Sequence, residues 1–213
     1  MPSKPVLILM TRWPAEGRCK KRLAFDIGSF KAALIQKKLI THTISVANIL
    51  EEEGLLETQL AISGLSNRAA KRWGLEQGIK TTECQGEGNL GLRMRRQILI
   101  AQRRSKKHVG HPTILIGSDL PNLCQAEVIK AIEALKKHEI VLGPSIDGGY
   151  WLIGLAGTLV KPVVNWPFIN MPWGTNKVLS TTLSRARLES VSHVLLSEQN
   201  DVDQIEDLSP WQA

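Results

Sequence analysis

Short apolar runs alternate with amphipathic helical patterns along the 213 residues, and this alternation limits the possible folds more than any other feature. Strand patterns separated by helical ones favour a parallel sheet with helices packed on its faces. Apolar runs predict strands at residues 6–10, 57–63, 78–84, 113–116, 139–142, 150–155 and 191–196. Apolar residues at helical spacing predict helices at about 29–53, 67–73, 90–101, 124–135 and 176–187. We therefore predict one α/β domain over residues 1–213 with a mostly parallel sheet, and the closely spaced strands around Asp147 predict a small antiparallel departure.

The composition is that of a globular protein, with 43% hydrophobic and 22% charged residues. No apolar run approaches the length that a transmembrane helix needs, and the run at 6–10 is too short for the core of a signal peptide. Three cysteines, at positions 19, 84 and 124, lie far apart without metal-binding spacing. These features predict a cytoplasmic protein without a transmembrane segment.

A net charge of +7 permits binding to an anionic partner. Basic residues gather in the loop before residue 23 and between 93 and 107, but no aromatic residues are interleaved with them, so we do not expect a nucleic-acid partner. One predicted helix carries Arg93, Arg96, Arg103 and Arg104 along one side. For these arginines a solvated face is favoured over a binding surface.

Asp119 follows the predicted strand 113–116, which stops at Gly117. Ligands of open α/β sheets bind beyond the carboxyl ends of the strands, so Asp119 is a candidate functional carboxylate. The alternative is a structural role, because Asp-Leu-Pro before a helical pattern also suits a turn or a helix cap.

Three further polar clusters follow strands or open helices, and each also has a structural interpretation. The loop at 11–23 carries Arg18, Lys20 and Arg22, which together suit a diphosphate or triphosphate, although a solvated basic loop is the alternative. Asp147 precedes two glycines, which suits close approach of a ligand or a simple hairpin turn. Asp201 and Asp203 point to the same side of an extended segment, or cap the helix that follows.

Asp119, Asp201 and Asp203 together would form an all-oxygen site suited to Mg²⁺ or Mn²⁺. Such a metal would neutralise charge that develops on a phosphate group, opposite the basic loop. The sequence shows no Ser-His-Asp set and no Walker or Rossmann glycine pattern.

Six stretches, in this order, resemble the GT-A-like nucleotide-diphospho-sugar transferase superfamily, and more closely a group of small bacterial proteins predicted to be glycosyltransferases. They lie at residues 12–24, 85–94, 117–121, 143–155, 172–175 and 201–208, and the most specific is Gly-Pro-Ser-Ile-Asp-Gly-Gly-Tyr at 143–150. The resemblance implies a Rossmann-like GT-A fold, a three-layer α/β/α sandwich.

The resemblance also implies roles for individual residues. The catalytic candidates are Asp119 and Asp147, and the metal-binding candidates are Asp119, Asp201 and Asp203. The nucleotide-binding candidates are Arg12, Arg18, Lys20, Arg22, Gly88 and Asn89. The acceptor-binding candidates are Gly148, Gly149, Tyr150 and Trp173, close to an irregular flap expected at 159–171.

The expected function is a metal-dependent glycosyltransferase that moves a sugar from a nucleotide-sugar donor to a small-molecule or lipid acceptor. A nucleotidyltransferase, which joins an NTP to a phosphorylated acceptor and releases pyrophosphate, is the alternative, and a non-catalytic nucleotide-binding protein is the third. The third stays open because Asn89 and Leu92 stand where relatives commonly carry acidic residues. Arg12 and Lys21 also depart from the usual loop, but both keep or add positive charge, so phosphate binding is still expected. The oligomeric state is left open, a homodimer included.

Overall fold

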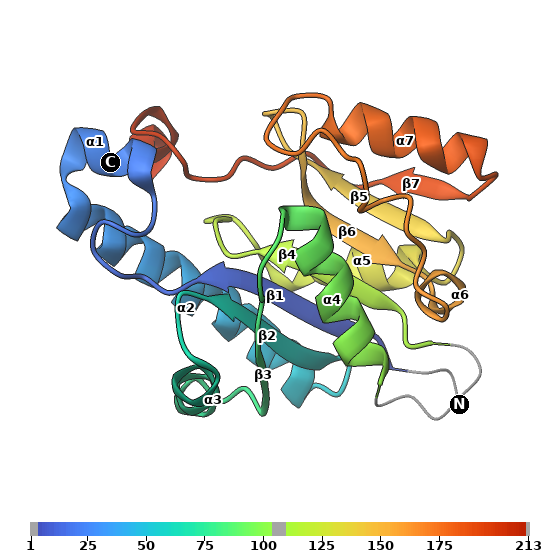
Figure 1. Ribbon diagram of the computed structural model, residues 1–213, viewed down its shortest axis with the longest axis horizontal. Helices are drawn as coiled ribbons and strands as arrows, with labels where there is room; N and C mark the ends of the chain where they lie inside the picture. The colour runs from blue at the N-terminus through green and yellow to red at the C-terminus, as the bar shows by residue number, and fades with distance from the viewer. Residues whose placement is uncertain (1–3, 104–109, 212–213) are drawn as a thin grey trace.

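The computed structural model describes residues 4–103 and 110–211, and Figure 1 shows the arrangement of their helices and strands. A seven-stranded sheet runs through the centre in the order β3-β2-β1-β4-β6-β5-β7. All neighbouring strands pair in parallel except at β6, which is antiparallel to both β4 and β5. The strands are β1 (Val6–Arg12), β2 (Glu57–Ser63), β3 (Thr81–Cys84), β4 (Thr113–Gly117), β5 (Ile140–Pro144), β6 (Tyr150–Leu155) and β7 (His193–Leu195). The mostly parallel sheet and its small antiparallel departure are thus confirmed.

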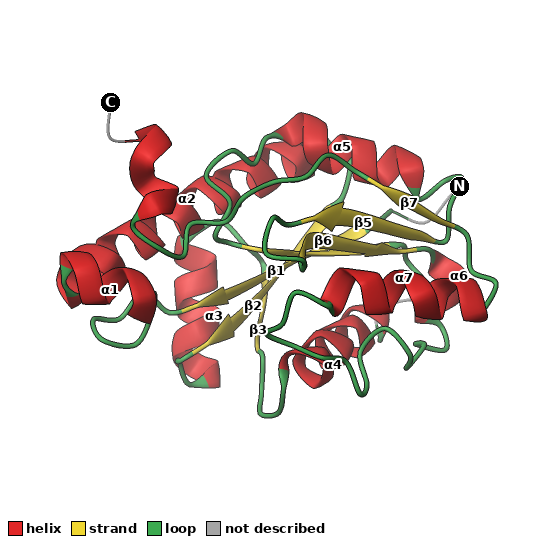
Figure 2. Cartoon of the chain, turned by 90° about the horizontal axis from the view of Figure 1, so that it is seen from above, coloured by secondary structure: helices red, strands yellow, loops and turns green. Residues whose placement is uncertain are grey.

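Helices cover both faces of the sheet, as Figure 2 shows with α2 and α5 on one side and α4, α6 and α7 on the other. The helices are α1 (Lys21–Ile27), α2 (Ser29–Glu52), α3 (Asn67–Glu76), α4 (Leu90–Gln102), α5 (Gln125–Ala134), α6 (Gly157–Val160) and α7 (Val178–Leu188), and a 3₁₀ helix, η1 (Glu206–Trp211), follows near the end. None of the helices within 4–103 and 110–211 is long and apolar enough to cross a membrane.

Each face of the sheet has its own apolar core, which explains why the strands are continuous apolar runs. In β1, Leu7 and Leu9 face the core shared with α2 and α5, whereas Val6 and Ile8 face the core shared with α4. A third, smaller cluster joins α1 and α2 to the carboxyl-terminal segment through Leu23, Leu39 and Val202. This third cluster fixes the part of the chain that borders the functional site.

The structure differs from the sequence prediction in two irregular regions. Residues 21–27 form α1, although a loop was expected up to residue 23 and no element for 24–27, because Leu23 lies fully buried between this short helix and α2. The irregular flap expected at 159–171 begins within the last residues of α6 and is anchored, since the Arg185 guanidinium donates hydrogen bonds to the carbonyl oxygens of Trp166, Ile169 and Asn170.

Candidate functional site

A cavity of about 360 Å³ lies at the carboxyl ends of β1 and β4, and we call it the first cavity. This is the position at which ligands bind in open α/β sheets. Its polar lining comes from several separate parts of the chain, and includes Thr11, Arg12, Lys20, Gln36, Ser63, Gln85, Arg93, Ser118, Asp119 and Asp203.

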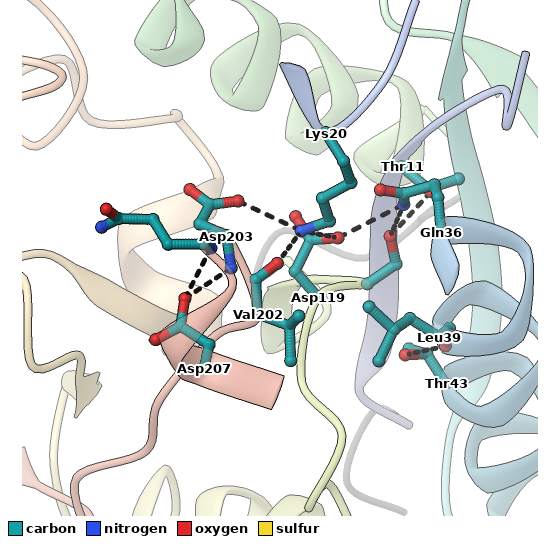
Figure 3. A network of polar contacts seen from close by, with 11 residues as sticks. Thr11, Lys20, Gln36, Leu39, Thr43, Asp119, Val202, Asp203 and Asp207 are labelled. Carbon is teal, nitrogen blue, oxygen red and sulfur yellow. Dashed lines mark hydrogen bonds and ion pairs between the residues drawn. The ribbon is translucent and has the colours of Figure 1, made fainter. Parts of the chain in front are cut away.

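Lys20 lies at the centre of the polar network shown in Figure 3. Its Nζ is 3.0 Å from Oδ1 of Asp119 and 3.1 Å from Oδ1 of Asp203, and its side chain is only 3% exposed. Burial alone would lower the pKa of Lys20, but the two carboxylates outweigh that effect and raise it. The ammonium therefore stays charged and joins the two carboxylates.

The backbone at Lys20 has an unusual left-handed conformation, with φ 45° and ψ 51°, directly before α1. A residue with a Cβ adopts this conformation at a cost, so its surroundings must hold it there. Here the buried ion pairs and a hydrogen bond from Nζ to the carbonyl oxygen of Val202 hold it.

Asp119 is positioned by the end of β4 and by α2. The preceding residue, Ser118, is buried and its hydroxyl lies 2.7 Å from the hydroxyl of Thr11 on β1. The Gln36 side-chain amide on α2 donates to Oδ1 of Asp119 at 3.2 Å. Cys124, not Asp119, precedes the first residue of α5, so the helix-cap interpretation of Asp119 does not hold.

The carboxyl-terminal segment brings Asp201 and Asp203 to the same place. The Val202 amide donates to the carbonyl oxygen of Asp119 at 3.0 Å, and the Val202 side chain is buried. Asp207 accepts hydrogen bonds from the backbone amides of Asp203 at 2.8 Å and Gln204 at 2.7 Å, so it is this carboxylate that caps the turn. Asp203 lines the first cavity, whereas Asp201 lines a neighbouring one.

The second cavity, of about 280 Å³, shares Asp119 with the first. Asp147 and Asp201 also line it, together with Tyr150 and Trp173. Burial, and then the proximity of Asp203 and Asp147, raise the pKa of Asp201 to about 6. Negative charge is thus concentrated between the two cavities.

Asp147 lies in the turn between β5 and β6, and its Oδ1 accepts a hydrogen bond from the Gly149 amide at 2.8 Å. Gly148 has φ 83°, and a Cβ there would lie 2.3 Å from the carbonyl oxygen of Asn176. The structure therefore explains Gly148 by a tight turn and by close contact with the chain before α7. Gly149 lines the second cavity.

Tyr150 and Trp173 form an edge-to-face aromatic pair with ring centroids 6.3 Å apart. Burial raises the pKa of the Tyr150 hydroxyl, so it stays protonated. Both rings border the second cavity and give it an apolar wall beside its carboxylates.

The six nucleotide-binding candidates do not all lie in one place. Arg12 and Lys20 line the first cavity, and Arg12 also donates to the carbonyl oxygen of Arg18 at 3.1 Å beside a separate basic pocket that Arg18 lines. Arg22 is exposed on α1, away from the lining of both cavities. Gly88 and Asn89 are exposed too, and Oδ1 of Asn89 caps α4 by accepting from the Leu92 amide at 3.0 Å.

The expectation of a solvated arginine face is wrong for Arg93 and Arg96, which are half-buried. Both donate to Gln85, at 3.0 Å and 2.7 Å, and Arg93 lines the first cavity. Arg103 is exposed as expected, and Arg104 lies outside the described residues. One residue could have indicated that Arg93 is half-buried. Gln97 lies one helical turn after Arg93, on the apolar stripe of α4, and it is buried, so this side of α4 faces the protein interior.

Within the described residues, no three Asp, Glu, His or Cys side chains are gathered closely enough to hold a metal ion. Lys20 itself lies between two of the three carboxylates expected to bind one. The carboxylate oxygens nevertheless match the preference of Mg²⁺ or Mn²⁺, which usually take their remaining ligands from water and substrate phosphates.

Comparison with known proteins places the chain in a family. Residues 46–175 match the family described as "Uncharacterized protein conserved in bacteria (DUF2064)". The chain belongs to this family. No curated protein matches this DUF2064 chain.

Several solved structures share this fold at low sequence identity. A "putative nucleotide-diphospho-sugar transferase" from Desulfovibrio desulfuricans G20 is 23% identical with a TM-score of 0.80, covering 97% of this chain and 85% of that one. The manganese complex of Rv0371C from Mycobacterium tuberculosis H37Rv is 15% identical with a TM-score of 0.55, covering 99% and 98%. A 4-diphosphocytidyl-2C-methyl-D-erythritol synthase from Anaerococcus prevotii DSM 20548 is 11% identical with a TM-score of 0.60, covering 96% and 95%. The DUF2064 chain thus shares its Rossmann-like α/β fold with the structure titled a putative nucleotide-diphospho-sugar transferase, and the predicted fold is confirmed.

Proposed function

We propose that this protein is a metal-dependent transferase acting on a nucleotide or nucleotide-sugar donor, and specifically a glycosyltransferase. The observation that carries this proposal is the position of Asp119, which is shared by an arginine-lined cavity and by a second cavity with aromatic walls. A donor bound in the first cavity and an acceptor bound in the second would both contact Asp119, so the transferred group could pass between them there.

Asp119, Asp201 and Asp203 would hold Mg²⁺ or Mn²⁺, together with phosphate oxygens of the donor. When bound, the metal would neutralise negative charge that develops on the departing phosphate. Lys20 keeps Asp119 and Asp203 in place, and the first cavity holds the nucleotide beside them. The manganese complex of a protein with the same fold supports the choice of metal.

The second cavity would hold the acceptor. Tyr150 and Trp173 supply a wall against which a sugar ring or an apolar chain can pack, and Asp147 would orient the acceptor hydroxyl. Because the hydrogen bond from Gly149 fixes Oδ1 of Asp147, its orientation is set before an acceptor enters.

Nucleotidyl transfer is the second candidate function. The neighbour named for diphosphocytidyl-methylerythritol synthesis shares the fold, and the two arginines that line the first cavity, Arg12 and Arg93, suit the longer phosphate chain of an NTP. Release of pyrophosphate from an NTP would favour this reaction, whereas release of an NDP from an NDP-sugar would favour glycosyl transfer.

The first experiment is a thermal-shift screen against NTPs, NDPs and NDP-sugars, with and without Mg²⁺ or Mn²⁺. We expect a stabilisation that requires both nucleotide and metal, and that is lost in Asp119→Asn but kept in Asp26→Asn, a control at an exposed aspartate of α1. Nucleotide binding without metal or turnover would instead support a non-catalytic nucleotide-binding protein. Failure of all ligands at millimolar concentration would contradict the proposal.

A further inference from the structure

The positive charge available to a ligand in the first cavity does not come from Lys20. Its ammonium already contacts Asp119 and Asp203, so these three side chains together carry one net negative charge. The other two cations that line this cavity, Arg12 and Arg93, have no such compensation, and neither has Arg96, which lies on α4 beyond the lining of the cavity. Within residues 4–103 and 110–211, no carboxylate forms an ion pair with any of these three arginines.

Neutral groups hold the arginines of α4 in position. Gln85 is buried, and its side-chain amide donates to the carbonyl oxygens of Thr11 at 2.8 Å and Ala61 at 3.0 Å. Its remaining side-chain oxygen accepts from Nη1 of Arg93, and its carbonyl oxygen accepts from Nη1 of Arg96. Gln85, which is held by hydrogen bonds to β1 and β2, therefore orients the guanidinium of Arg93.

Arg93 retains hydrogen-bonding capacity that nothing in the described chain uses. Its Nε is buried and has no hydrogen-bond partner. Burial, and then the nearby charges of Arg12 and Arg96, lower the pKa of Arg93. A half-buried cation beside other cations is costly unless an anion joins it, so the surroundings of Arg93 are those of a site made to bind one.

We propose that Arg93, supported by Arg12 and Arg96, is a phosphoryl-binding residue of the first cavity. This inference rests on the proposed function for the identity of the ligand. Guanidinium groups pair with phosphate through two parallel hydrogen bonds, which suits a phosphate better than an uncharged base or ribose. The phosphoryl group belongs either to the phosphate chain of the nucleotide or to a phosphorylated acceptor, and both share this chemistry.

The test compares Arg93→Gln with Arg103→Gln by isothermal titration calorimetry. Both changes remove one positive charge, in α4 for Arg93 and at the end of α4 for Arg103. Arg103 is exposed, whereas Arg93 is half-buried, so Arg103→Gln controls for the loss of charge alone. The probes are inorganic pyrophosphate, the NTP or NDP-sugar that gives the largest shift in the thermal screen, and the corresponding nucleoside. Arg93→Lys, which keeps the charge but loses the planar fork, is the conservative variant.

We expect Arg93→Gln to weaken pyrophosphate and nucleotide binding by about 10- to 100-fold, the effect of losing hydrogen bonds to a charged group. Arg103→Gln should leave both affinities within about twofold, and Arg93→Lys should recover part of the loss. Nucleoside affinity should not change. If pyrophosphate binding is lost while nucleotide binding is kept, the phosphate that Arg93 holds is that of the acceptor.

Two outcomes would overturn the inference. Unchanged pyrophosphate and nucleotide binding in Arg93→Gln would show that Arg93 binds no phosphate. The proposed function would still stand in that case, provided that the wild type binds nucleotide in a metal-dependent way. An equal loss of nucleoside and nucleotide binding would show that Arg93 contacts the base or ribose instead. Conversely, pyrophosphate binding that depends on Arg93 in a protein that binds no nucleotide would uphold the anion site and contradict the proposed function.

Discussion

The Nζ of Lys20 lies 3.0 Å from Oδ1 of Asp119, and this contact joins two parts of the chain that are 99 residues apart in sequence. The same nitrogen reaches Asp203, 183 residues from Lys20. A single buried ammonium thus connects the loop before α1, the end of β4 and the carboxyl-terminal segment. Because these carboxylates are also the proposed metal ligands, the ammonium and a divalent ion compete for the same negative charge.

Lys20→Met should destabilise the protein and strengthen its binding of divalent ions. Removing one partner of a buried ion pair leaves the others uncompensated, and since the two carboxylates are about 40% exposed we expect a loss of roughly 2 kcal/mol in the free energy of unfolding. Urea denaturation measures this loss, and added Mn²⁺ should raise the melting temperature of Lys20→Met more than that of the wild type. Lys21→Met, at the exposed neighbouring lysine, is the control, and equal stability of the two variants would contradict the role given to Lys20.

Asp201→Asn should stabilise the metal-free protein at neutral pH while weakening its metal-dependent activity. The pKa of Asp201 is about 6 in the folded state, against 3.8 for an aspartate side chain free in water, so the folded protein holds this proton more tightly. The resulting destabilisation is absent below about pH 4, grows as the pH rises, and is complete above the folded pKa. A shift of about two pKa units corresponds to at most about 3 kcal/mol, and solvent screening of a half-buried carboxylate reduces it to roughly 1 kcal/mol.

Melting temperatures measured in EDTA at pH 4 and pH 8 test this expectation. Asp201→Asn and the wild type should agree at pH 4, and the variant should melt higher at pH 8. A stabilisation of equal size at both pH values would mean that charge repulsion at Asp201 is not its source.

Much of the fold could be predicted from the sequence because buried strands and long helices have local signatures. The strand limits at Glu57–Ser63 and Tyr150–Leu155 were predicted without error, and α2 was predicted to within one residue. Helix α1 was missed because its seven residues are helical mainly through tertiary packing of Leu23 against α2.

The candidate site was less predictable, for the same physical reason. Asp119 could be singled out because a strand end is visible in the sequence. The pairing of Lys20 with Asp203 and the anchoring of Arg93 by Gln85 depend on tertiary contacts. No local sequence pattern indicates which segments will lie next to each other in the fold. Gly148, the first of the two glycines after Asp147, was explained only when the chain before α7 was seen to lie against it.

Gly148→Ala should destabilise the protein strongly. The new methyl group would lie 2.3 Å from the carbonyl oxygen of Asn176, and the backbone φ of 83° disfavours any residue with a Cβ. Displacing backbone costs more than displacing a flexible side chain, so we expect a loss of about 3 kcal/mol. Gly117→Ala is the matched control for stability, because a Cβ there meets nothing within 4 Å, and chemical denaturation should show it close to the wild type.

Arg185→Met should release the segment that leads to the second cavity. Its guanidinium donates to the carbonyl oxygens of Trp166, Ile169 and Asn170 at 2.7–2.8 Å, so the variant loses three charge-assisted hydrogen bonds while methionine keeps most of the apolar stem. We expect a loss of about 2–3 kcal/mol in stability and faster limited proteolysis within residues 165–173. Arg187→Met, at an exposed arginine of the same helix, should change neither the stability nor the rate of proteolysis.

The segment held by Arg185 leads to Trp173, which lines the second cavity, so acceptor binding should weaken in Arg185→Met while nucleotide binding in the first cavity is kept. Equal loss of acceptor and nucleotide binding would contradict the assignment of two separate cavities to donor and acceptor.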